Sequence, residues 1–90
     1  MRLNDEYRLE TVAGQSMLVN YGSDSVDLSK AFSISGPVAF LWERLVGKDF
    51  TTDMMASMLC EEYDVTLQKA LEDTEVLVME WKKWGLIQER

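Results

Sequence analysis

The side chains that could do chemistry in this chain are one cysteine and many carboxylates, and none of the 90 residues is histidine. Histidine is the commonest general base and the commonest metal ligand, so both roles lack their usual residue. Cys60 has no histidine to help form a thiolate, and we interpret it as a half-buried structural thiol. A single cysteine permits no internal disulfide and is typical of a reducing, cytoplasmic setting.

The carboxylates often stand next to one another, as in Glu61-Glu62 and Glu72-Asp73. Neighbours in sequence point to different sides of a helix, so these pairs favour a solvated surface over a general acid–base pair. The five glycines are scattered and form no phosphate-binding loop. We therefore expect no catalytic residue, no metal site and no cofactor.

Sixteen acidic and nine basic residues give the chain a net charge of −7. Nucleic acids and anionic membranes both attract clustered Lys and Arg, so neither is expected as a partner. The apolar run Val76-Leu77-Val78-Met79 is far too short to cross a bilayer. At this length we expect one domain, spanning residues 1–90.

The first part of the chain is predicted to be β-structure. Alternating apolar and polar side chains predict strands over residues 7–12, 16–21 and 31–35. Gly14 can take a positive φ and marks a turn between the first two strands, and the composition of residues 22–25 indicates a loop. In the third strand, Phe32 and Ile34 face one way, and Ala31, Ser33 and Ser35 face the other.

The second part is predicted to be three helices, over about residues 37–46, 52–63 and 66–84. Pro37 fits the first turn of a helix, and Thr66 can cap the last one. One stripe of that helix holds Leu67, Ala70, Leu71, Thr74, Leu77, Val78, Trp81 and Trp84. The expected core contains Trp42, Leu45, Leu59, Leu77 and Trp81. Strands followed by helices predict an α+β fold with an N-terminal three-stranded antiparallel sheet.

Two features suggest a binding surface. A three-stranded sheet has two edges, and residues 31–35 carry neither the proline nor the charge that often protects an edge. Val76 and Met79 lie nearly opposite the Leu77 and Trp81 side of the last helix, where they could contact a partner. The alternatives are an ordinary free edge and scattered apolar residues on the surface.

Four short segments follow one another in an order and spacing that resemble a known family. They are Thr11-Val12-Ala13-Gly14, Ser35-Gly36-Pro37-Val38-Ala39-Phe40-Leu41-Trp42-Glu43, Glu61-Glu62-Tyr63-Asp64-Val65 with the later Asp73, and Trp84-Gly85-Leu86-Ile87. Together, over about residues 7–88, they resemble the PqqD-like proteins, named for pyrroloquinoline quinone biosynthesis. Ser35 stands where that family usually has Asn, and Val76 and Met79 occupy positions that are usually polar.

The resemblance implies a winged helix-turn-helix-like domain with no enzymatic activity. Similar domains hold the leader of a ribosomally made precursor peptide for a modifying enzyme, often a radical S-adenosylmethionine protein. The leader adds as a strand beside the third strand and rests against the third helix. The implied peptide-binding residues are Ala31, Phe32, Ser33, Ile34, Ser35, Val76 and Met79. The alternatives are a winged-helix transcription regulator, for which the third helix is too acidic, and a structural domain or homodimer joined through the same edge strand.

Overall fold

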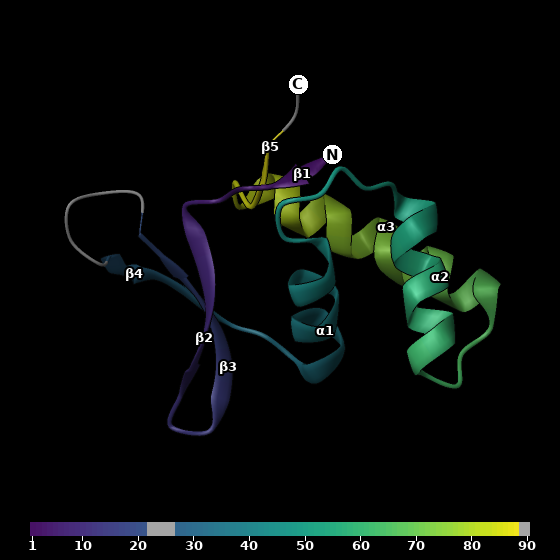
Figure 1. Ribbon diagram of the computed structural model, residues 1–90, viewed down its shortest axis with the longest axis horizontal. Helices are drawn as coiled ribbons and strands as arrows, with labels where there is room; N and C mark the ends of the chain where they lie inside the picture. Colours follow the sequence, from purple (N-terminus) through teal and green to yellow (C-terminus); the bar gives the residue numbers. More distant parts are fainter. Residues whose placement is uncertain (22–26, 89–90) are drawn as a thin grey trace.

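The computed structural model describes residues 1–21 and 27–88 (Figure 1). The elements are β1 (Arg2–Leu3), β2 (Tyr7–Val12), β3 (Gln15–Asn20), β4 (Asp27–Ser33), α1 (Gly36–Leu45), α2 (Thr52–Glu62), α3 (Leu67–Lys83) and β5 (Ile87–Gln88). The loop predicted at residues 22–25 lies outside the described residues. The predicted α+β fold, with a three-stranded antiparallel sheet and three helices, is confirmed.

The three-stranded sheet has the order β2-β3-β4, so β2 and β4 are its edges. A tight hairpin joins β2 to β3, and Val12 pairs with Gln15 at its end. Ala13 and Gly14 both have positive φ, at 52° and 81°. A two-residue turn with this backbone matches the natural twist of the strands it joins. The sequence located the turn through Gly14, but alanine seldom takes this conformation and gave no signal.

The third strand of the sheet was predicted over residues 31–35, and these bounds are wrong. β4 begins at Asp27 and ends at Ser33. Its pairing with β3 shifts register between Leu18 and Asn20. Residues 27–30 contain only one apolar residue, Leu28, so no apolar alternation predicts the first half of the strand. Ile34 lies beyond the strand, although its N–H still donates to the carbonyl of Ser16 at 3.0 Å.

The helices begin where their capping residues predict. Thr51 accepts a hydrogen bond from the N–H of Met54, and Thr66 accepts one from the N–H of Lys69, both at 3.2 Å. Such caps satisfy N–H groups that have no partner inside the helix. α1 begins with Gly36 and Pro37. No helix in the described parts of the chain is long and apolar enough to cross a membrane.

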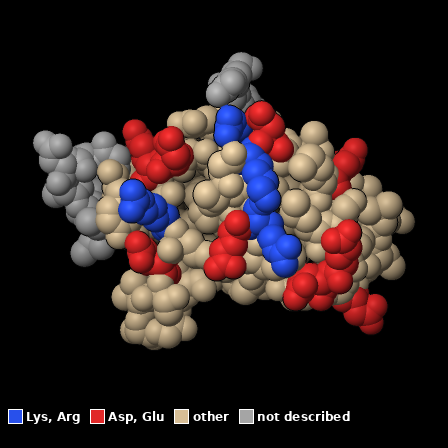
Figure 2. All heavy atoms as spheres, in the orientation of Figure 1, with Lys and Arg blue, Asp and Glu red and all other residues tan. Residues whose placement is uncertain are grey.

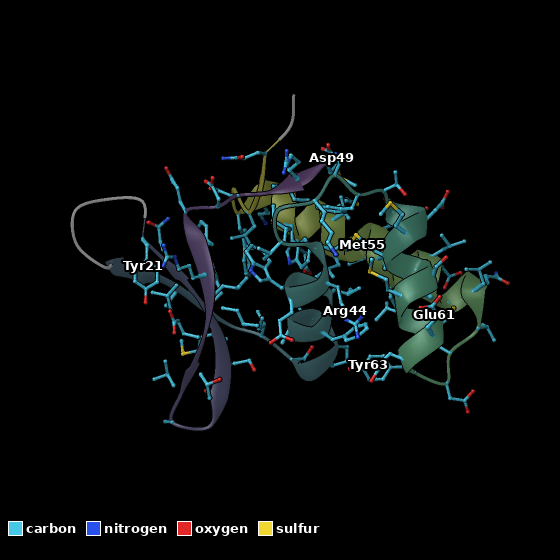
Figure 3. The ribbon with its side chains drawn as sticks, viewed as in Figure 1. Tyr21, Arg44, Asp49, Met55, Glu61 and Tyr63 are labelled. Carbon is cyan, nitrogen blue, oxygen red and sulfur yellow. The ribbon has the colours of Figure 1, made fainter. Side chains whose placement is uncertain are left out.

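Aromatic rings join α1 to α2 near the end of α2 (Figure 3). Phe40 meets Tyr63 edge to face, with ring centroids 5.9 Å apart. The Arg44 guanidinium lies 5.0 Å from the centre of the Phe40 ring on the same side of α1. Met55 of α2 is fully buried. Stacked and edge-to-face contacts of this kind fix the angle between helices as well as burying area.

The core lies where the sheet, α1 and α3 meet. Trp42, Leu45 and Trp81 are buried as predicted, and Leu59 and Leu77 are partly buried against them. Trp42 and Trp81 meet edge to face, with their ring centroids 5.5 Å apart. This pair links α1 to α3 at the centre of the molecule.

The predicted stripe of α3 is correct in the middle of the helix and wrong at its ends. Ala70, Thr74, Val78 and Trp81 are buried, but Leu67 and Trp84 are exposed. Leu67 is the first residue of α3. Trp84 is the C-cap residue, with φ −98° and ψ 7°, so the chain is already leaving the helix there.

The two ends of the described chain form a small sheet that the sequence did not predict. β5 pairs with β1, which places Leu3 opposite Ile87. Asn4 adds two hydrogen bonds to this pairing. Its backbone N–H donates to the Leu86 carbonyl at 2.8 Å, and its side-chain amide donates to the Gly85 carbonyl at 2.9 Å. Two-residue strands are too short to show a periodic pattern. The pairing holds the end of α3 beside the sheet.

Candidate functional site

The edge of β4 presents unpaired main-chain groups at Ser33. Ile34 donates its N–H to Ser16, and Met17 is directly opposite Ser33. In an antiparallel ladder, neighbouring residues alternate between pointing toward the partner strand and away from it. The N–H and C=O of Ser33 therefore point away from β3. Within the described residues nothing pairs with this side of β4, so a further strand could add there.

A narrow groove of about 180 Å³ runs between this edge and α3. Its walls are Phe32, Ser33, Ile34, Ser35, Val38, Leu77, Glu80, Trp81, Trp84 and Leu86. β4 and the start of α1 supply one wall, and the second half of α3 supplies the other. The groove thus places an open strand edge beside a mostly apolar helix surface.

The structure brings most of the predicted site residues together, but not all of them. Phe32, Ser33, Ile34 and Ser35 line the groove, whereas the half-buried Ala31 does not. Val76 is 56% exposed and lines an adjoining hollow of about 210 Å³ between α1, α2 and α3. Met79 is 71% exposed and lines neither the groove nor this adjoining hollow.

Trp84 is a groove residue that sequence reasoning placed on the same stripe of the last helix as Leu77 and Trp81. Its ring stacks on Phe32, with centroids 4.6 Å apart and planes 16° from parallel. Even so, 48% of its surface is exposed. The stack forms one end wall of the groove and one wall of a further hollow of about 430 Å³ near Asn4 and Tyr7. A tryptophan directly before Gly85, where the helix must end, was the available signal.

Five more groove residues were not predicted for the site: Leu77, Glu80, Val38, Trp81 and Leu86. Leu77 and Glu80 also line the hollow beside Val76, so the groove and that hollow share a wall at this point of α3. Leu77 was assigned to the core, and it is in fact half-buried at the core's edge. A residue on the boundary between core and surface is hard to place from helical spacing alone.

Asp73 lines the hollow beside Val76, Glu80 lines both that hollow and the groove, and the environments of the two carboxylates differ. Asp73 lies 3.0 Å from Lys69, and the hydrogen bond that Lys69 donates raises the pKa of its ammonium group. Glu80 has no ion pair with any described residue. The charge left available in the groove is therefore that of Glu80.

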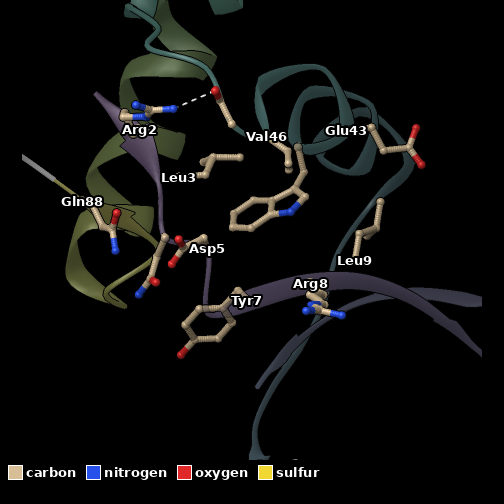
Figure 4. A pocket seen from close by; sticks show the side chains of 12 residues that line it. Arg2, Leu3, Asp5, Tyr7, Arg8, Leu9, Glu43, Val46 and Gln88 are labelled. Atoms are coloured by element: carbon tan, nitrogen blue, oxygen red, sulfur yellow. Dashed lines mark hydrogen bonds between the residues drawn. The ribbon is translucent and has the colours of Figure 1, made fainter. Parts of the chain in front are cut away.

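A larger hollow of about 680 Å³ lies beside the opposite edge of the sheet (Figure 4). Its lining is Arg2, Leu3, Asn4, Asp5, Tyr7, Arg8, Leu9, Trp42, Glu43, Val46, Gly47 and Gln88. Arg2 crosses one end of it and donates to the Gly47 carbonyl at 2.7 Å. Charges of both signs thus face this hollow, unlike the mainly apolar groove.

The surface offers little for metal binding. Over the described residues, no three His, Cys, Asp or Glu side chains come together as ligands could. Cys60 is half-buried, in line with its interpretation as a structural thiol. Figure 2 shows Lys and Arg in a diagonal band near the middle of the face and in a smaller separate patch at the left, with Asp and Glu beside both.

Comparisons with known proteins point to one family and one fold. The family model described as coenzyme PQQ synthesis protein D (PqqD) matches residues 15–87. No curated protein is similar enough to this chain to count as a match.

Two solved structures have a similar fold. The first is TbiB1 in complex with the TbiA(beta) leader peptide, with a TM-score of 0.74 and 13% identity, covering 100% of this chain and 98% of that one. The second is a lasso peptide synthetase B1 complexed with the leader peptide, with a TM-score of 0.71 and 22% identity, covering 98% and 96%. At these identities the likeness establishes the fold.

Proposed function

The chain belongs to the PqqD family, and from this premise we propose that it is an adaptor that binds the leader of a ribosomally made precursor peptide for a modifying enzyme. The observation that carries the proposal is the unpaired edge of β4 beside the apolar groove on α3. A peptide strand gains affinity from main-chain hydrogen bonds and specificity from side-chain pockets next to the edge. Both similar structures contain a leader peptide, which supports this use of the fold.

The proposed binding surface extends along the groove. Ser33 supplies the outward main-chain groups, and Phe32 and Ile34 supply the apolar floor. Ser35 also lines the groove, Ala31 and Val76 lie at its margins, and Met79 would contact only a peptide that extends beyond the groove. Trp84, Leu77 and Glu80 complete the wall on α3.

The adaptor role includes a second partner, the enzyme that modifies the peptide. We propose a radical S-adenosylmethionine protein, in line with the family resemblance noted from the sequence, and a cytoplasmic setting. The chain itself has no histidine and no paired carboxylate in the groove, so the proposal assigns no catalytic step, metal or cofactor to it. The whole chain acts as one peptide-recognition domain.

A transcription regulator is a weaker interpretation of the same fold. α3 would be its recognition helix, but this helix carries Glu72, Asp73, Glu75 and Glu80 against Lys69, Lys82 and Lys83. Such a surface gives no favourable release of counterions from DNA. A homodimer through β4 would use the same edge and would therefore compete with the peptide.

The direct test is a selection of random linear peptides on the immobilised full chain, with counter-selection on the Ser33→Pro variant. Proline removes the outward N–H of Ser33, at modest cost to an edge strand. We expect peptides that bind the native chain and not this variant. Thr11→Pro is the matched control, because the register of β2 with β3 also points the Thr11 N–H away from the sheet. Peptides that bind all three proteins equally, or a dimer that excludes peptide, would contradict the proposal.

A further inference from the structure

The groove has a charge preference that can be read from its walls. Resting on the proposed function, we infer that Glu80 selects leaders with a lysine or arginine at the centre of the docked strand. The strand would also carry apolar residues two positions before and two positions after the basic one. The inferred partner is therefore a peptide strand whose inward-facing residues are apolar, basic and apolar in that order.

Glu80 is an exposed residue on the wall that the groove shares with the adjoining hollow. It lines both the groove and the adjoining hollow, together with Val38 and Leu77. Trp84, the C-cap residue that follows α3, lies four residues after Glu80 and stacks on Phe32. The carboxylate is thus bordered on each side along the helix by an apolar surface.

The geometry of a strand matches this arrangement. Residues of adjacent strands that lie opposite one another point to the same face. Phe32 and Ile34 pack toward the core, and Ser33 is exposed on the other face. Every second residue of an added strand would therefore face α3, at intervals of about 7 Å. Since Leu77 and Trp84 are seven residues apart, they lie about 10 Å apart along the helix axis.

Three inward-facing side chains of the peptide cover that length. The outer two meet apolar walls, one at Leu77 and Val38 and the other at Trp84. The middle one meets Glu80. A docked strand removes water from this carboxylate, and a carboxylate that loses water without gaining a partner is unfavourable. The long apolar stem of lysine or arginine can lie along the groove while its charged end reaches the carboxylate.

The competing cations do not remove the need for a partner. Lys69 on the same helix is paired with Asp73. Lys83 follows Glu80 by three residues on α3, but no described residue, Lys83 included, forms an ion pair with Glu80. The overall charge of −7 favours approach of a basic peptide but does not choose which of its residues is basic. The position-specific preference must therefore come from Glu80.

The test repeats the peptide selection on the native chain, on Glu80→Gln and on Glu80→Lys. Glu75→Lys is the matched control, because it changes the net charge of the chain by the same amount as Glu80→Lys. Glu75 is an exposed residue of α3 that lines neither the groove nor the adjoining hollow. On the native chain and on Glu75→Lys we expect lysine or arginine at one position, with apolar residues two places away on each side. On Glu80→Gln this enrichment should disappear. On Glu80→Lys it should change to aspartate or glutamate.

A second measurement uses one selected peptide and its central Lys→Glu version in calorimetric titrations. The native chain should bind the altered peptide about tenfold more weakly, as expected for a charge-assisted hydrogen bond of about 1.4 kcal/mol. The Glu80→Lys variant should bind this altered peptide about as tightly as the native chain binds the original one. Peptides that depend on Ser33 but show no central charge preference would overturn the inference while leaving the proposed function intact. Failure to select any Ser33-dependent peptide would overturn both.

Discussion

The two edges of the three-stranded sheet each border a hollow, and the hollows differ in size and in the charge of their walls. Beside β2 lies the larger one, about 680 Å³, lined by two arginines, an aspartate and a glutamate. Beside β4 lies the groove of about 180 Å³, where Glu80 is the charged residue. If volume alone indicated a binding site, β2 would be preferred.

The strand edges reverse that ranking. Charged side chains stand along β2, where the Arg8 guanidinium lies 5.2 Å from the centre of the Tyr21 ring. The Tyr21 hydroxyl donates to the Glu10 carboxylate at 3.0 Å, and this hydrogen bond raises the pKa of Tyr21. Charges of this kind discourage the addition of a strand. The end of β4 from Ala31 to Ser33 has no such protection, so strand chemistry is a better guide than volume.

The largest effect is expected on stability, at the tryptophan pair in the core between the groove and the larger hollow. Trp81 lines the groove and packs edge to face on Trp42, which lines the larger hollow. Trp81→Ala should lower the free energy of unfolding by about 3–5 kcal/mol, because burial is lost and a cavity remains. Urea unfolding followed by circular dichroism measures the change. An unfolding curve that coincides with that of the native chain would show that the two regions do not share a core.

The next effect separates the two edges. Ser33→Pro should weaken binding of a selected peptide by at least about tenfold, since a ladder hydrogen bond is lost and the proline ring obstructs the approaching strand. Thr11→Pro makes the same change on the edge of β2 and should leave the affinity unchanged. Fluorescence anisotropy with a labelled peptide measures both. The comparison fails if Thr11→Pro is the more damaging variant.

A smaller effect separates the walls of the two hollows. Trp84→Ala removes the ring that stacks on Phe32 and should weaken peptide binding about fivefold, within the range for an aromatic contact. Val46 is similarly exposed in the larger hollow, and Val46→Ala should have no effect on affinity. The same anisotropy titration provides the readout. Equal losses in the two variants would mean that the peptide also contacts the larger hollow.

The last prediction is that the chain does not bind duplex DNA. The β2 side carries Arg2 and Arg8, and basic residues are where nucleic acid would bind first. With acidic residues alongside and a net charge of −7, we expect no binding of mixed-sequence duplex DNA at physiological salt. A gel-shift titration tests this. Submicromolar, salt-sensitive binding would support a regulator instead and give the β2 side a function.

The sequence predicted the groove's strand wall better than its helix wall. Phe32 and Ile34 alternate with Ser33, and alternation is a local signal that identifies which side chains share a face. Helical spacing predicted the buried residues in the middle of α3 as well as alternation predicted the strand. It could not show that Trp84 turns away from the core, because that depends on where the helix ends and on the distant Phe32.

The pairing of β1 with β5 was likewise beyond sequence reasoning. It brings residues 2–3 beside 87–88, and each strand is too short for any periodicity. The open edge at Ser33 was predicted from composition, while the direction of its N–H required the register with Met17. Local patterns therefore predicted the elements, and contacts between distant segments decided which of their residues form the site.

The most direct test of the central claim is an NMR titration of the ¹⁵N-labelled chain with a selected peptide. If the peptide adds to β4, the amide shifts should concentrate at residues 31–35 and along α3 from Leu77 to Trp84. The Ser33 amide should also become protected from hydrogen exchange, because its N–H gains a partner. Shifts confined to β2 and the larger hollow, to α2 or to the Ala13-Gly14 turn, with residues 31–35 unmoved, would contradict binding at the β4 edge.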